Sequence, residues 1–200
     1  MIVVGLTGGI ASGKSFVVKY LDKINIISHD SDKVISDLYS SGDKNLTSFL
    51  FKSGFKKSLL NNGINKKIIR DIIFSNTEKR IKLEKYLHSR VKKSRDVFIR
   101  INKKKKRKIV FLDIPLLFEN KLESLCDVIC STIAPLNLRE NRALQRPGMK
   151  KKIFKQIVKN QVADKYRKKK SDYLIDTSKT RKKTYLQVDV LIYDALKKWQ

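Results

Sequence analysis

The stretch Gly8-Gly-Ile-Ala-Ser-Gly-Lys-Ser15 matches the pattern G-x-x-x-x-G-K-[ST] and directly follows the apolar run Met1–Thr7. That run is rich in β-branched residues and has the length of a buried parallel strand. Residues 15–21 can continue as a helix. A strand, a glycine-rich loop and a helix in this order form the context in which the pattern cradles phosphate groups. The sequence therefore predicts a nucleoside triphosphate site at this end of the chain.

The residues of this loop have separate predicted roles. Lys14 is expected to reach the β- and γ-phosphates, and the Ser15 hydroxyl is expected to hold Mg²⁺. Backbone amides of the loop and of the first helical turn would point at a phosphate. The predicted ATP-binding residues of the loop are Gly8, Gly9, Ala11, Ser12, Gly13, Lys14, Ser15 and Phe16.

The bulk composition limits the class of protein. Two hundred residues, 41% of them hydrophobic, fit one globular domain with insertions. No apolar stretch approaches membrane-spanning length, and no signal-peptide pattern precedes the loop, so we expect a cytoplasmic protein without a membrane partner. Cys126 and Cys130 lie in a mostly apolar stretch and are expected to be reduced core or near-core residues. No second Cys/His pair accompanies them, which argues against a metal site.

The net charge of +27 raises the alternative of a nucleic-acid-binding ATPase. The basic residues are spread along the chain, with runs at 103–108, 150–152 and 167–170, and no aromatic residues are interleaved as stacking platforms. We therefore expect salt-sensitive, non-specific binding to nucleic acid and no specific nucleic-acid partner. Stimulation of ATP turnover by DNA or RNA would favour the alternative.

Strand and helix patterns alternate along most of the chain, which predicts an α/β fold with a parallel sheet. Residues 44–101 are the exception, because they show helical patterns and no convincing strand, as in a helical insertion. Residues 77–101 read as one long helix or two. Further strands are expected at 24–28, 108–114, 127–132 and 173–175, and further helices at 33–40, 137–145, 150–165 and 180–199.

Carboxylates follow two of these strands, and ligands of parallel sheets bind at the carboxyl ends of strands. This rule places Asp30, Asp32 and the segment Pro115–Glu119 around one cleft with the loop. Asp30 suits a base that takes a proton from an acceptor hydroxyl, and either Asp could instead cap the helix that follows. Asp113 closes a strand where a carboxylate would contact Mg²⁺ through water, or is simply the first residue of a loop.

Three arginines, Arg139, Arg142 and Arg146, recur at spacings of three and four, which predicts one helical face. Such a face could clamp phosphates bidentately or be a solvated basic surface. The guanine-reading motif Asn-Lys-x-Asp of GTPases does not occur, and the chain is too short for a helicase or motor. A small kinase remains.

Taken together, the motifs resemble the dephospho-coenzyme A kinase family, and the similarity runs from end to end. They are Gly5–Ser15, Asp30-Ser-Asp32, Leu87-His88, Pro115-Leu-Leu-Phe-Glu119, the stretch 142–161 and Asp172-Tyr-Leu-Ile175. The chain departs from the family's usual residues at several places. Ala11 stands where Gly is usual, Phe16 where Thr is usual, and Thr177 where Asn is usual.

The resemblance implies Mg²⁺-dependent transfer of the ATP γ-phosphate to the ribose 3′-hydroxyl of dephospho-CoA, the last step of coenzyme A synthesis. It implies a P-loop nucleoside-kinase-like fold, with a five-stranded parallel sheet and helices on both faces. In a single domain, the core would span about 1–35, 102–137 and 167–200, a helical acceptor-binding insertion about 36–101, and a lid about 138–166.

The resemblance also implies roles for particular residues. Asp30 would be the catalytic base, and Lys14 and Arg142 would stabilise the transferring phosphoryl group. Arg146 would contact ATP, and Ser15 and Asp113 would hold Mg²⁺. The expected acceptor-side residues are Asp32, Arg70 and His88. The expected partners are ATP and dephospho-CoA, and the expected state is a monomer or a weak homo-oligomer. Another small-molecule kinase on the same fold, for nucleotides or shikimate, is the main alternative.

Overall fold

The computed structural model describes residues 1–61 and 63–198. The chain forms two compact units, which are described separately below. The sheet unit comprises residues 1–29 and the described residues from 101 onward, and the helical unit comprises residues 30–100.

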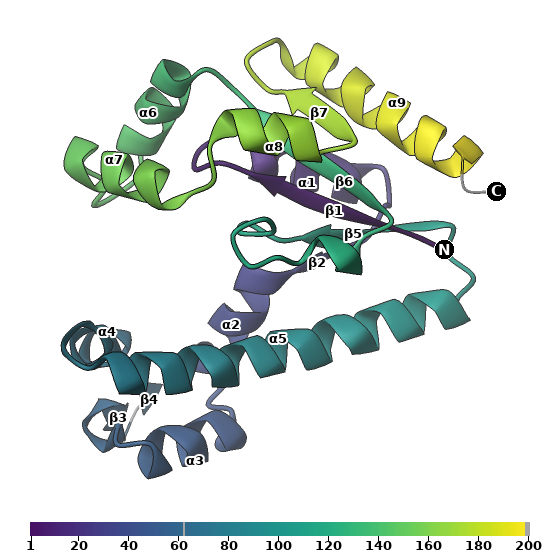
Figure 1. The fold of residues 1–200 in the computed structure, drawn as a ribbon. Helices are drawn as coiled ribbons and strands as arrows, with labels where there is room; N and C mark the ends of the chain where they lie inside the picture. The colour runs from purple at the N-terminus through teal and green to yellow at the C-terminus, as the bar shows by residue number, and fades with distance from the viewer. Residues whose placement is uncertain (62, 199–200) are drawn as a thin grey trace. The chain divides into compact units, whose positions relative to one another are not determined.

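A five-stranded parallel sheet forms the centre of the sheet unit, which confirms the predicted fold class (Figure 1). Its strands, in spatial order, are β2 (Ser28–Asp30), β5 (Ile109–Asp113), β1 (Ile2–Gly8), β6 (Val128–Ile133) and β7 (Tyr173–Asp176). Every residue of β1 and of β5 is buried. Both strands are mostly apolar, with Thr7 and Asp113 near their carboxyl ends as exceptions, because central parallel strands are covered on both faces. The phosphate loop thus leaves the sheet at its middle strand.

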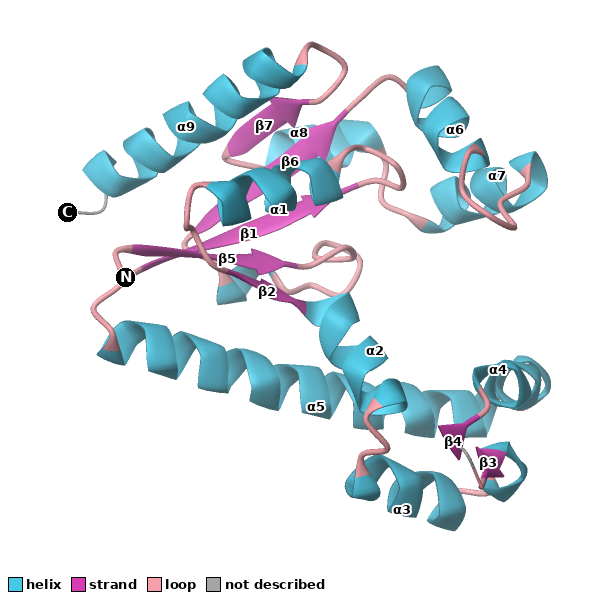
Figure 2. Ribbon diagram, turned by 180° about the vertical axis from the view of Figure 1, so that it is seen from behind, coloured by secondary structure: helices cyan, strands magenta, loops and turns pink. Residues whose placement is uncertain are grey.

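Helices cover both faces of this sheet. α1 (Lys14–Lys23) and α9 (Arg181–Lys198) lie on one face, and α8 (Asp164–Lys170) lies on the other (Figures 1 and 2). Two further helices, α6 (Leu136–Leu144) and α7 (Lys151–Asn160), lie between β6 and α8 in the chain, and a short 3₁₀ helix, η2 (Glu123–Leu125), precedes β6. The main core joins α1 and α9 to the strands through Leu6, Val17, Leu21, Phe111, Val188 and Leu191.

The helical unit has a hydrophobic core of its own, in which Leu46, Leu50, Phe55, Ile69 and Leu83 are buried. Its elements are α2 (Ser31–Ser40), α3 (Lys44–Lys52), η1 (Lys56–Ser58), β3 (Leu59–Leu60), β4 (Gly63–Ile64), α4 (Lys66–Ser75) and most of α5 (Thr77–Lys104). The pattern at 77–101 is therefore a single helix. The two-residue strands β3 and β4 pair antiparallel and were not predicted, because strands this short carry no alternating pattern.

Most predicted elements agree with the structure to within three residues, and two differ by more. The strand expected at 24–28 begins only at Ser28, because Ile24 is the C-cap of α1 and Asn25 turns the chain with a left-handed φ of 57°. The helix expected at 150–165 is divided into α7 and α8, because Gln161 and Ala163 have extended backbones. The apolar periodicity of this stretch continued across the break and concealed it.

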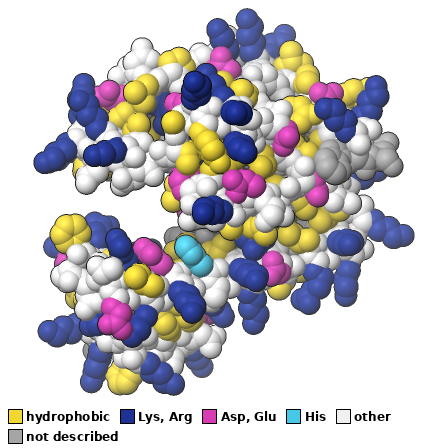
Figure 3. All heavy atoms as spheres, viewed as in Figure 1, with side chains coloured by type: hydrophobic (Ala, Val, Ile, Leu, Met, Phe, Trp, Pro, Cys, Tyr) yellow, Lys and Arg dark blue, Asp and Glu magenta, His cyan; other side chains and the backbone are white. Residues whose placement is uncertain are grey.

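The predicted core or near-core placement of the cysteines is confirmed, since Cys130 is fully buried in β6 and Cys126 is partly buried. Burial raises the pKa of the Cys130 thiol, which keeps it in its unreactive protonated form. Over residues 1–61 and 63–198, no helix combines the length and apolar character needed to cross a membrane. Figure 3 shows lysine and arginine side chains scattered among other residues rather than gathered in one patch.

Candidate active site at the phosphate loop

The loop between β1 and α1 presents the start of a helix without a side-chain cap. Gly13 is the N-cap of α1, with a left-handed φ of 93°, and it offers no side chain to the first amides of the helix. Those amides are therefore suited to a phosphate oxygen. A side chain at Gly13 would be strained by its φ, and its Cβ would lie 2.7 Å from Thr177 Oγ1. Ala11 has a φ of 57°, a conformation that glycine adopts with less strain.

Lys14 and Asp113 form an ion pair at the start of α1. The exposed fractions of the two side chains are only 17% and 6%. Asp113 is the last residue of β5 and lies opposite Leu6 of β1 in the parallel register, so the sheet sets its position. An ammonium held here in a partly dry site is a fixed positive charge beside the loop.

The donor set at this place suits Mg²⁺. The Ser15 hydroxyl and the Asp113 carboxylate are hard oxygen donors, which Mg²⁺ prefers. Within the described residues, no group of three or more His, Cys, Asp or Glu side chains could hold a metal ion by itself. A site of few protein oxygens completed by water and substrate phosphates is the usual arrangement for this ion.

Asp30 is the N-cap of α2. Its Oδ1 accepts the Lys33 N–H at 2.8 Å, while Asp32 is exposed in the first turn. The capping interpretation therefore holds for Asp30 itself. The cap occupies one carboxylate oxygen, so it is compatible with a proton-accepting role for the same side chain.

The prediction that three arginines of the α6 region share one helical face is wrong for Arg146, while Arg139 and Arg142 both lie on α6. α6 ends at Leu144, and Arg146 lies exposed in the turn beyond it. Arg142 reaches Thr177 twice, donating from Nη1 to Oγ1 at 3.0 Å and from Nη2 to the carbonyl oxygen at 2.7 Å. Thr177 Oγ1 in turn donates to the Ser12 carbonyl at 2.7 Å. Thr177 thus holds Arg142 beside the loop.

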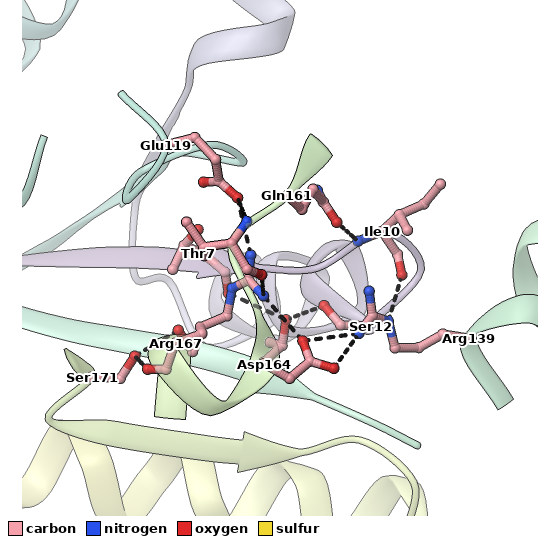
Figure 4. A network of polar contacts seen from close by, with 12 residues as sticks. Thr7, Ile10, Ser12, Glu119, Arg139, Gln161, Asp164, Arg167 and Ser171 are labelled. Carbon is pink, nitrogen blue, oxygen red and sulfur yellow. Dashed lines mark hydrogen bonds and ion pairs between the residues drawn. The ribbon is translucent and has the colours of Figure 1, made fainter. Parts of the chain in front are cut away.

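Arg139 is buried with an exposed fraction of 3%, so a solvated basic surface is excluded for it. Its Nη1 contacts both carboxylate oxygens of Asp164, at 3.0 and 2.8 Å. Arg167, at 1% exposure, contacts Asp164 at 3.1 Å and Glu119 at 3.2 Å (Figure 4). Two buried cations are thereby balanced by two carboxylates.

Burial lowers the pKa of the Arg167 guanidinium from its usual value, and the carboxylates of Glu119 and Asp164 oppose that shift. An arginine stays charged under such conditions, so the network remains ionic. Sequence reasoning missed these partners. Arg167 opens the basic run 167–170 and looks like surface charge there, while Asp164 is its partner three residues away and Glu119 is forty-eight residues away.

The other predicted side chains are placed as follows. Ser12 is buried and its Oγ lies 2.7 Å from Thr132 Oγ1, which fixes the loop to β6. The Phe16 ring stacks on Tyr185 of α9, with ring centroids 5.2 Å apart. In the helical unit, Arg70 on α4 and His88 on α5 are both exposed.

Gly9→Ala is expected to destabilise the protein by about 1–3 kcal/mol, the usual cost of overpacking. A Cβ at Gly9 would overlap the guanidinium of Arg139 and lie 2.7 Å from its Cζ. The ion pair with Asp164 keeps that guanidinium from moving aside. Denaturant unfolding measures the change. In an Arg139→Ala background the same substitution should cost clearly less, and an equal cost in both backgrounds would contradict the clash.

The fold and the loop define a P-loop small-molecule kinase. The family model for dephospho-CoA kinase matches residues 2–183. The dephospho-CoA kinase of Bartonella quintana is 34% identical over 98% of this chain and 100% of its own length, and that of Fusobacterium nucleatum is 32% identical over 94% and 96%. The chain belongs to the dephospho-CoA kinase family, which confirms the resemblance.

The fold comparison agrees with that assignment. The structure of the dephospho-CoA kinase from Campylobacter jejuni superposes with a TM-score of 0.73, covering 99% of this chain and 98% of the other. The sequence identity of the pair is 22%, so this match is evidence for the fold alone.

Proposed function

We propose that this chain transfers the γ-phosphoryl group of ATP to the ribose 3′-hydroxyl of dephospho-CoA, completing coenzyme A. The observation that carries the proposal is family membership over nearly the whole chain, with curated relatives matched from end to end. The phosphate loop supports it independently, because the uncapped start of α1 and the half-buried Lys14 suit the β- and γ-phosphates.

In the proposed reaction the 3′-oxygen forms a bond to the γ-phosphorus while the bond from that phosphorus to the bridging oxygen of ADP breaks. The Asp30 carboxylate, at the carboxyl end of β2, takes the proton of the hydroxyl. Lys14 and Arg142 neutralise charge on the transferring group. Ser15 and Asp113 would hold Mg²⁺, which when bound shields the phosphate charges.

The remaining assignments follow the same proposal. Residues 36–101 would bind the acceptor through the exposed Arg70 and His88, and the exposed Asp32, which precedes this insertion, would also contact it. Residues 138–166 would form a lid, and Arg146 beyond α6 would contact the nucleotide. We propose a cytoplasmic enzyme with no specific nucleic-acid partner that works as a monomer or weak homo-oligomer.

A coupled ADP-release assay tests the proposal directly. ADP release should be fast with dephospho-CoA, and slow with shikimate, nucleoside monophosphates or no acceptor. Faster release with one of the other acceptors would make this chain a different kinase of the same fold. Hydrolysis stimulated by DNA or RNA without dephospho-CoA would favour a nucleic-acid-dependent ATPase.

Arg142→Ala is expected to lower kcat about a hundredfold, the scale of one lost transition-state donor. Arg142→Lys should recover only part of the rate, because lysine keeps the charge but loses the planar fork that now binds Thr177 twice. Steady-state kinetics on both variants measure this. Asn141→Ala, an exposed neighbour on α6, serves as the control, and full activity in Arg142→Ala would make this arginine a structural residue only.

A further inference from the structure

The middle of the phosphate loop is held from outside the motif. The Ile10 N–H donates to Gln161 Oε1 at 2.8 Å, and the Ile10 carbonyl accepts from Arg139 Nε at 2.9 Å. Figure 4 shows Gln161 and Arg139 approaching Ile10 from two sides. Both contacts are made to the backbone, so they act on the path of the loop whatever side chain it carries.

The segment that supplies these contacts is itself fixed. Gln161 is the C-cap of α7, and Asp164 begins α8 three residues later. Asp164 pairs with both Arg139 and Arg167. The intervening Val162 N–H donates to Glu119 Oε1 at 3.0 Å. The connection between α7 and α8 is therefore clamped at each end and at its middle.

An ionic network built around two buried arginines adds little net stability, because desolvation of these charges offsets most of their attraction to the carboxylates. Its distinctive effect is to fix relative positions. The element it positions here is Ile10, which lies three residues before Gly13 and the amides that would bind phosphate. A shift of the Ile10 backbone would change where those amides point, and phosphate binding depends on their alignment.

We propose that Gln161 and Asp164 are positioning residues for the phosphate loop. They fix the backbone of Ile10, Gln161 directly and Asp164 through Arg139, and so set the affinity for the triphosphate without touching it. The proposal uses the proposed function only for the identity of the nucleotide. Because coupling is reciprocal, ATP should in turn protect the α7–α8 connection.

The deciding variant is Gln161→Leu, which removes a neutral acceptor from a half-buried site and disturbs no ion pair. Loss of one hydrogen bond should raise the Kd for Mg·ATP about threefold to tenfold. Calorimetric titration without acceptor measures it. The Kd for inorganic tripolyphosphate should rise by the same factor. The KM for dephospho-CoA should stay within about twofold, since only phosphate binding is affected. Gln156→Leu, at an exposed position of α7, is the matched control.

Asp164→Asn tests the indirect contact to Ile10, in which Asp164 holds Arg139 by an ion pair. This substitution should raise the Kd for ATP more than Gln161→Leu does. In the double variant the Kd should rise by less than the product of the two single increases, because both substitutions act on one backbone segment. Should Asp164→Asn fail to fold, Gln161→Leu still decides. Hydrogen exchange of the Ile10 and Val162 amides should slow when ATP is added to the unaltered protein and slow less in Gln161→Leu.

Unchanged ATP affinity in folded Gln161→Leu would overturn the proposal, and so would a rise in the KM for dephospho-CoA alone. An equal loss of affinity for ATP and for adenosine would also overturn it, because adenosine has no phosphate for the loop to bind. Failure of the proposed function looks different: ATP affinity would depend on Gln161, yet dephospho-CoA would not be phosphorylated.

Discussion

Lys14→Ala is expected to lower kcat by a factor of about 10²–10³, the cost of removing one preorganised charge from a site where charge develops. Lys14 is the cation that the loop presents to the phosphates, and it begins α1 directly after the N-cap Gly13. Its side chain has an exposed fraction of 17%, so water can only partly replace the lost charge. Steady-state kinetics at saturating ATP measure the effect.

The ion pair with Asp113 adds a second consequence. Without Lys14, the Asp113 carboxylate loses a cation at a place where its own side chain is 6% exposed. We expect the free energy of unfolding to fall by at most about 3 kcal/mol, the lower end of the cost of breaking a buried ion pair, because Lys14 is partly exposed. Lys14→Met keeps the length of the side chain and should show the same loss of rate. Lys19→Ala, at an exposed lysine of the same helix, should leave the rate unchanged. Near-normal kinetics in a folded Lys14→Ala would refute the phosphate-loop assignment.

The parts of the fold that were predictable are those whose cause is local. β1 and β5 appear in the sequence as mostly apolar runs, because parallel strands buried on both faces need them. The loop appears because the chemistry of phosphate binding requires glycines, a lysine and a hydroxyl within eight consecutive positions. Strand β2 was misplaced because the apolar residues before it serve the end of α1, where Asn25 turns the chain.

The parts of the site that were missed depend on distant partners. Arg139 donates to a carbonyl 129 positions away at Ile10, and Gln161 accepts from the same residue across 151 positions. No spacing rule connects such residues. The high lysine and arginine content concealed the buried arginines further, because a basic run in a chain of net charge +27 is most simply read as surface. Burial is the property that separates Arg139 and Arg167 from the exposed cations, and burial is set by tertiary packing.

The same distinction applies to the two carboxylates after β2. Sequence alone left open which of them caps α2, and the structure gives the cap to Asp30. A cap and a catalytic base make different demands on a carboxylate. Capping needs an oxygen that accepts from an amide, whereas a base must also be able to take up a proton. A single substitution can therefore remove one property and keep the other.

Asp30→Asn is expected to lower kcat by about 10²–10⁴, the usual contribution of a general base, with little change in the affinity for ATP. The asparagine oxygen can still accept the Lys33 N–H that Asp30 Oδ1 accepts at 2.8 Å, so α2 should keep its cap and the protein its stability. The amide cannot take the proton of the 3′-hydroxyl. Kinetics, ATP titration and thermal unfolding on one preparation measure the three quantities together.

Asp30→Ala and Asp32→Asn complete the Asp30 experiment. Asp30→Ala should lose the cap as well as the base, and so reduce the free energy of unfolding by about 1 kcal/mol in addition to the loss of rate. Asp32 is exposed in the first turn of α2, and its substitution should have a far smaller effect on kcat than that of Asp30. A crippled Asp32→Asn beside an active Asp30→Asn would reverse the assignment, because the base would then be the carboxylate that does not cap the helix.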